Sequence, residues 1–130
     1  MASIFTRIIN REIPGHIILE DDQFIAFLDI SPLVIGHTLV VPKKEVDYLF
    51  DHDDQTLADI NVFSKKVAVA IKKSIPCKRV GVAVIGLEVP HTHIHLVPMN
   101  TMDDLNFTRP KLNPSKEQLA EAAEKIRKSL

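Results

Sequence analysis

Apolar positions in the first third of the chain predict one short helix followed by three strands. Apolar residues recur at four-residue spacing just after Ser3, whose hydroxyl suits a helix N-cap, so we expect an amphipathic helix there. The apolar runs 17–19 and 24–28 flank a short polar stretch and predict a β-hairpin. A third apolar run over 37–41, stopped by a proline, predicts another strand.

The rest of the chain predicts two helices, two strands and one irregular segment. Apolar residues at three- and four-residue steps predict a long helix over 54–75. The valine-rich run 80–85 is typical of a buried central strand, and 91–97 follows it as the last strand. Residues 99–113 show no periodicity and predict a surface loop, before a final helix over 114–130.

This order of elements predicts an α+β fold. Strands and helices do not alternate regularly, and short connections between strands favour antiparallel pairing. We therefore expect an antiparallel sheet of about five strands with helices packed on one face. A chain of 130 residues fits one domain, so residues 1–130 are expected to form it, with 99–113 and 114–130 as an extension.

Composition narrows the possible functions. The net charge of −1 provides no basic field for nucleic acid, although a few local donors could still hold a single nucleotide. Cys77 is the only cysteine, which excludes an internal disulfide and is compatible with a cytoplasmic location, the one we expect. No apolar run approaches the roughly 20 residues of a membrane span, so no membrane association is expected.

Three histidines, His91, His93 and His95, alternate with other residues near the end of the predicted sheet. Because a strand alternates its side chains between two faces, all three are predicted to lie on one face as a row of imidazoles. Histidine packs less well than valine and is less well solvated than lysine. A row of three therefore points to a function.

A metal site is one interpretation of this row. Histidine is a common zinc ligand, but His91 and His95 would lie about 13 Å apart along a regular strand, given a rise of about 3.3 Å per residue. One zinc ion needs each nitrogen within about 2.1 Å, and no nearby cysteine completes a site. We therefore predict no metal site and no cofactor.

Covalent catalysis is the second interpretation. A neutral imidazole is a competent nucleophile near pH 7, because its unperturbed pKa is about 6.5. It can attack phosphorus and form a phosphoramidate that water then hydrolyses. His93 is predicted to be the nucleophile, because the flanking imidazoles could orient the phosphate and stabilise developing charge.

Three motifs resemble those of the histidine triad (HIT) family, particularly its nucleotide-binding, Hint-like branch. They are FLDISP at 27–32, GHTLVVPKK at 36–44 and HTHIHLVP at 91–98. Their order and spacing also match, and together with the N-terminal helix the resemblance covers residues 3–98.

This resemblance implies a site residue by residue. His93 matches the residue that forms a nucleotidyl-histidine, His95 a phosphate contact, His91 the first triad member and His37 a fourth, supporting histidine. Asp29 matches a ribose-binding carboxylate, although from the residues alone it could instead cap a turn. The other implied nucleotide-binding residues are Ile4, Phe5, Ile8, Phe27, Leu28, Ile30, Leu39, Gly86 and Glu88. A purine nucleotide or nucleotide conjugate as ligand, and a homodimer, are also implied.

Several residues depart from the family pattern. The loop before the triad has no asparagine, and Leu87 replaces the usual glutamine. Glu88 brings a carboxylate near the phosphate, which is repulsive unless it meets a base, a metal or a leaving amine. Glu45 replaces a histidine often found after the second motif, while His16 and His52 match no motif and are predicted at the surface.

We therefore expect a hydrolase that releases a nucleoside monophosphate from an amine, a nucleoside phosphoramidase. A hydrolase of dinucleoside polyphosphates would use the same chemistry. A nucleotide-binding regulatory protein with little turnover would account for the altered loop, and a metal-dependent enzyme is the remaining alternative.

Overall fold

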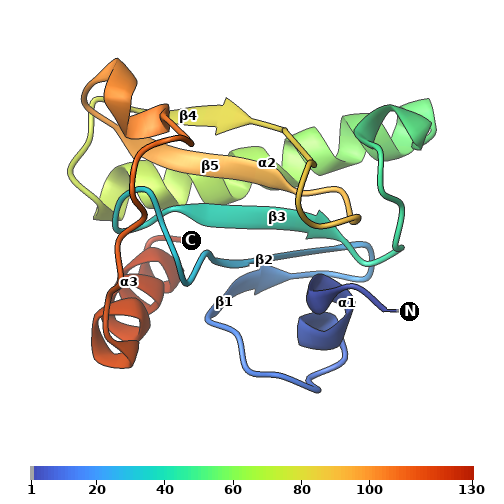
Figure 1. Ribbon diagram of the computed structural model, residues 1–130, viewed down its shortest axis with the longest axis horizontal. Helices are drawn as coiled ribbons and strands as arrows, with labels where there is room; N and C mark the ends of the chain where they lie inside the picture. The colour runs from blue at the N-terminus through green and yellow to red at the C-terminus, as the bar shows by residue number, and fades with distance from the viewer. Residues whose placement is uncertain (1) are drawn as a thin grey trace.

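A five-stranded sheet in the order β1-β2-β3-β5-β4 organises the computed structural model, which describes residues 2–130 (Figure 1). All neighbouring strands are antiparallel, so the predicted fold class is confirmed. The strands are β1 (Ile17–Glu20), β2 (Phe24–Leu28), β3 (Thr38–Pro42), β4 (Arg79–Ala83) and β5 (Ile94–Met99). The helices are α1 (Ile4–Ile9), α2 (Asp54–Ser74) and α3 (Lys116–Lys128), with short 3-10 helices η1 (Leu49–Asp51) and η2 (Met102–Leu105).

The two faces of the sheet carry different layers because alternate strand residues point to opposite sides. Residues such as Ala26 and Val40 form one core with α2 and α3, and Figure 1 shows α2 crossing behind the strands. Residues such as Phe27 and Leu39 form a second cluster with α1 on the other face. The two long helices therefore share one face, and only the short α1 packs on the opposite one.

The long helix begins and ends close to the predicted limits. The carboxylate of Asp53 accepts from the backbone N–H of Thr56 and caps α2, and basic residues occupy its last turn, where they complement the helix dipole. The final helix begins at Lys116 rather than 114, because Ser115 and Gln118 form a capping box. Within residues 2–130, no helix combines the length and apolar character needed to cross a membrane.

The prediction of a buried central strand over 80–85 was wrong. β4 ends at Ala83 and lies at the edge of the sheet, where among the described strands it pairs only with β5. Val82 is 60 % exposed. The apolar run therefore marks an edge with an exposed apolar surface.

The last strand also differs from its prediction over 91–97. β5 begins at Ile94, so His91 and His93 lie in the irregular segment that precedes it. Residues 99–113 were predicted as a plain surface loop. Instead, Met99 is the last residue of β5, and Met102–Leu105 form η2.

Candidate active site

A cavity of about 400 Å³ opens on the α1 face of the sheet. One part of its wall is apolar and is formed by α1, the segment after it and strand residues, namely Ile4, Phe5, Ile8, Ile13, Pro14, Gly15, Phe27, Leu28, Ile30 and Leu39. The other part carries the titratable side chains Asp29, His37, Glu88, His93, His95 and Lys111. An apolar wall joined to a cluster of polar groups is typical of a small-molecule site.

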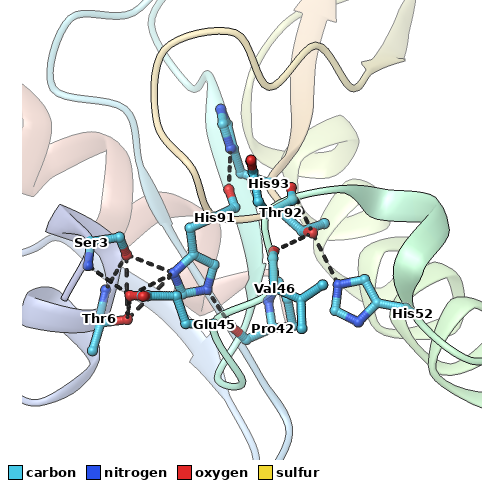
Figure 2. A network of polar contacts seen from close by, with 10 residues as sticks. Ser3, Thr6, Pro42, Glu45, Val46, His52, His91, Thr92 and His93 are labelled. Atoms are coloured by element: carbon cyan, nitrogen blue, oxygen red, sulfur yellow. Dashed lines mark hydrogen bonds and ion pairs between the residues drawn. The ribbon is translucent and has the colours of Figure 1, made fainter. Parts of the chain in front are cut away.

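His93 is held by one hydrogen bond that decides its tautomer. Its Nδ1 lies 2.7 Å from the backbone oxygen of His91, and because a carbonyl only accepts, Nδ1 must carry the proton (Figure 2). In the neutral ring Nε2 therefore keeps its lone pair. The ring packs between Phe5 and His95, at centroid distances of 4.9 and 5.0 Å. His93 thus has a fixed ring orientation, between one imidazole and one phenyl ring.

His37 and His95 form a buried relay behind it. The backbone N–H of Leu33 donates to Nδ1 of His37 over 3.0 Å, so His37 must carry its proton on Nε2. That Nε2–H donates to Nδ1 of His95 over 2.9 Å. By the same reasoning, Nε2 of His95 carries a proton and is the donor that remains for a ligand.

Burial keeps both histidines of this relay neutral. Loss of hydration, followed by the neighbouring His95, lowers the pKa of His37 to about 3. Loss of hydration, followed by the nearby His93, lowers the pKa of His95 to about 4. At neutral pH the relay therefore donates hydrogen bonds without adding positive charge to the cavity.

Asp29 combines the two roles considered for it. One carboxylate oxygen, Oδ1, accepts from the backbone N–H of Ser31 over 2.9 Å, as in a turn cap. The other, Oδ2, lies 3.8 Å from Nε2 of His37, and the residue lines the cavity. Burial is the main cause that raises the pKa of Asp29. The free oxygen can accept from a ligand hydroxyl while the first one holds the turn.

His91 does not line the cavity, so the predicted row of three imidazoles was wrong. Its side chain is fully buried, with Nε2 donating to the backbone oxygen of Pro42 over 2.7 Å. Nδ1 lies 2.6 Å from Oγ of Ser3 and accepts its hydroxyl proton. The physical reason is that the chain has not yet entered β5 at His91, so strand alternation does not apply there.

The His91 network ties the N-terminus to the site. Oγ of Ser3 also accepts from the backbone N–H of Thr6 and caps α1. Oε1 of Glu45 accepts from the Ser3 N–H and from the Thr6 hydroxyl, each over 2.6 Å. Figure 2 shows these residues on one side of the His91 ring and Pro42 on the other. The network fixes α1, and with it Phe5, against His93.

Loop residues 85–89 close another side of the cavity. Gly86 has a φ of +75°, a conformation that favours glycine, and both Gly86 and Glu88 line the cavity as predicted. Leu87 is almost fully exposed at the rim. Glu88 therefore adds a carboxylate to this part of the cavity wall.

All the predicted nucleotide-binding residues line the cavity, as do His37, His93 and His95 among the predicted catalytic residues. The sequence interpretation missed Phe107 and Lys111, which lie in the segment predicted as a surface loop. It predicted Ser3 as the N-cap of the first helix, as observed, but missed the His91 network that Ser3 forms with Thr6 and Glu45. His52 is not simply a surface residue: its Nε2 lies 2.9 Å from Oγ1 of Thr92, which itself donates to the Val46 oxygen. No sequence pattern marks Phe107 and Lys111 as site residues, because each is a single side chain in a segment without periodicity.

One group of side chains resembles a metal site. Among residues 2–130, the ligand atoms of Asp29, His37 and His95 lie within 4.8 Å of one another. However, the two imidazole nitrogens are 2.9 Å apart and share a proton, whereas nitrogens bound to one tetrahedral zinc ion lie about 3.3 Å apart. The group is arranged as a hydrogen-bonded relay, and a metal would have to break it.

The HIT domain family matches residues 10–102, so this chain belongs to that family, whose members are nucleotide-binding hydrolases. Adenosine 5'-monophosphoramidase HNT1 of Saccharomyces cerevisiae is 37% identical over 98 residues, which cover 75% of this chain and 62% of the yeast protein.

Two solved structures share the fold over nearly the whole chain. A HIT-like protein of Bartonella henselae, described as involved in cell-cycle regulation, has a TM-score of 0.86 at 35% identity and covers 98% of this chain and 96% of its own. A zinc-bound histidine triad family protein of Mycobacterium smegmatis has a TM-score of 0.85 at 29% identity and covers 99% and 93%.

Proposed function

We propose that this protein releases a nucleoside monophosphate from an amine, through a covalent nucleotidyl-histidine on His93. The observation that carries the proposal is the fixed tautomer of His93. Its Nδ1–H is anchored on the His91 carbonyl, and the ring borders the cavity with its Nε2 lone pair free for attack.

The cavity suits a nucleotide along its length. The apolar wall around Phe5, Ile8 and Phe27 can take a purine base, because flat rings pack well against aliphatic and aromatic side chains. The free Oδ2 of Asp29 can accept from ribose hydroxyls. A phosphate attached to that ribose would then lie toward His93 and His95.

The reaction would proceed in two displacements. Nε2 of His93 attacks phosphorus and forms an N–P bond, while the substrate's own P–N bond breaks and the amine leaves with that electron pair and a proton from solvent. Water then attacks phosphorus and breaks the N–P bond. His93 recovers its lone pair, nucleoside monophosphate is released, and the remaining water proton passes to solvent.

Neighbouring groups would stabilise the charge that develops. Nucleotidylated His93 is cationic, and the His91 carbonyl, which accepts from its Nδ1–H over 2.7 Å, offsets that charge. Nε2–H of His95 can donate to a phosphoryl oxygen throughout the reaction. Both groups are in place before a substrate binds.

The charges of the cavity favour an amine leaving group over a polyphosphate. Two carboxylates, Asp29 and Glu88, line it, while the relay histidines are neutral. A chain of phosphates would need several cations, whereas an amine would be attracted to Glu88. The activity named for the yeast relative, an adenosine 5'-monophosphoramidase, agrees with this preference. The intact nucleophile argues against a purely regulatory protein.

Steady-state turnover of adenosine 5'-phosphoramidate and of a diadenosine polyphosphate tests the proposal. We expect the phosphoramidate to be preferred, and His93→Ala to lose several orders of magnitude in kcat. His16→Ala, outside the cavity, is the matched control. A nucleotidyl adduct on His93 should appear by mass spectrometry, and near-normal turnover by His93→Ala would refute the mechanism.

We also propose a cytoplasmic homodimer. β4 is an edge strand with exposed Val82, and α2 exposes Val62 and Val69, which are 59% and 44% accessible. An apolar edge of this kind is suited to pairing with a second copy. Sedimentation should show a dimer that Val82→Lys dissociates and Phe50→Lys, at an exposed apolar position on η1, does not. The single free Cys77 suits a reducing compartment.

A further inference from the structure

Residues Asn106–Leu112, which we call the strap, lie beyond the range matched by the HIT domain family. The strap runs from the end of η2 toward α3, beside the loop that follows β2 (Figure 1). Nη2 of Arg109 donates to the Leu33 oxygen over 2.6 Å, and the Leu112 N–H donates to the Pro32 oxygen over 2.9 Å. The strap is therefore fixed to the loop that carries Asp29 and contacts His37.

Phe107 attaches the strap to the histidine relay. Its ring meets that of His95 edge to face, at 4.7 Å between centroids, and lies 6.3 Å from that of His37. It is half-buried and lines the cavity. The strap is thus a wall of the proposed active site.

Lys111 extends from this wall beside the cavity. Its Nζ donates to the Phe107 oxygen over 3.0 Å and lies 5.4 Å from the centroid of the Phe107 ring. Across residues 2–130 it makes no ion pair with a carboxylate within 4.0 Å. An ammonium has three donors, so two remain for a ligand.

The positive charge of Lys111 reaches the reacting part of the cavity. It is one of the causes, after burial, that lower the pKa of both His37 and His95, and it acts against burial on the pKa of Asp29. Of these three side chains, His95 borders the place where the phosphate would lie, and His37 lies behind it, 2.9 Å away. Lys111 lines the same cavity as His93 and His95, from the strap side.

Lys111 is also the only lysine or arginine among the described residues that line the cavity. Against it stand the carboxylates of Asp29 and Glu88, and the two relay histidines are neutral. A nucleoside monophosphate adds negative charge to a site that already carries two negative groups. Without a cation at this point, binding its phosphate would be repulsive.

On the basis of the proposed function, we infer that Lys111 binds the phosphoryl oxygens of the nucleotide at His93. It would attract the anionic phosphate from solvent and offset charge on the same oxygens as His93 attacks. Glu88 would then be free to meet the amine on the leaving side. The strap would supply phosphate recognition from outside the matched HIT domain range.

Calorimetric binding of adenosine 5'-monophosphate and of adenosine tests this inference, because the two ligands differ only in the phosphate. Lys111→Met should weaken binding of the monophosphate about tenfold or more and leave adenosine binding unchanged, the range expected for a charge-assisted hydrogen bond. Lys111→Arg should restore most of the affinity. Lys116→Met removes an exposed lysine at the start of α3 and should change neither affinity.

Each outcome decides between the proposals. An equal loss of affinity for both ligands in Lys111→Met would show that the strap only supports the fold of the site. Unchanged affinity for the monophosphate would show that Lys111 does not contact the phosphate. Either result overturns the role of Lys111 and leaves the His93 mechanism standing. Wild-type protein that binds neither ligand would overturn both proposals.

Discussion

Replacing His91 by alanine should destabilise the protein and leave its chemistry largely intact. The side chain is fully buried and makes short hydrogen bonds to the Pro42 oxygen and to Oγ of Ser3, with a longer one to Oγ1 of Thr6. His91→Ala removes the hydrogen bonds to the Pro42 oxygen and to Oγ of Ser3, at roughly 1–3 kcal/mol each, and empties the space of the ring. We expect a loss of about 3–5 kcal/mol in the free energy of unfolding.

The nucleophile should survive this change. His93 is anchored on the backbone oxygen of residue 91, which the substitution keeps. Ser3→Ala should lower the free energy of unfolding less, by about 1–2 kcal/mol, since it removes the Ser3–His91 hydrogen bond together with the N-cap of α1. In both variants kcat should fall less than about tenfold, in contrast to the several orders of magnitude expected for His93→Ala.

Urea unfolding and single-turnover kinetics on the same preparations separate the two effects. For a chain of this length, a loss of 3–5 kcal/mol corresponds to a fall of about 10–20 °C in Tm. The reasoning would be refuted by His91→Ala with unchanged stability and a kcat reduced as strongly as that of His93→Ala. That result would mean that the His91 side chain takes part in the chemistry.

Three further predictions concern the cavity. Asp29→Asn should weaken binding of adenosine 5'-monophosphate about tenfold by calorimetry with little change in Tm, because the amide oxygen can still accept from Ser31; a large loss of Tm with unchanged affinity would leave only the turn cap. Folded His37 and His95 have pKa values of about 3 and 4, below their unfolded value near 6.5, so the stability they contribute is present above pH 6.5 and lost as the pH falls toward 4. The slope of the unfolding free energy against pH should reach about 1.4 kcal/mol per pH unit for each histidine, and His37→Asn should remove the contribution of one histidine. An unchanged slope in that variant would contradict the lowered pKa of His37. Zinc should not raise the Tm, because it must break the 2.9 Å relay bond, and stoichiometric zinc lost together with activity on chelation would show otherwise.

Local patterns predicted most of the fold. The hairpin of β1 and β2, the strand β3 and the helix α2 follow from apolar periodicity and capping residues, which act over a few positions. The apolar run that became β4 shows the limit of this signal. A valine run indicates a buried or contacted surface but does not say whether a strand is central or at an edge.

The misplaced parts of the site depend on contacts between distant residues. His91 leaves the expected face because Ser3 and Pro42 bind it, from 88 and 49 positions away in the chain. The strap joins the site because Arg109 reaches the oxygen of Leu33, 76 positions away. No periodicity within either segment encodes these contacts, so only the folded chain could reveal them.

The relay histidines and the strap together account for the charge of the site. Burying His37 and His95 fixes their tautomers and leaves a directed donor on His95, but it also removes any positive charge they could offer an anion. In the proposed complex, the attraction for the phosphate must then come from a group that remains hydrated and charged, and Lys111 on the strap is exposed and meets that condition. A single such cation suits one phosphoryl group, whereas the carboxylate of Glu88 disfavours a second. This distribution of charge therefore agrees with the proposed substrate, a nucleoside monophosphate joined to an amine.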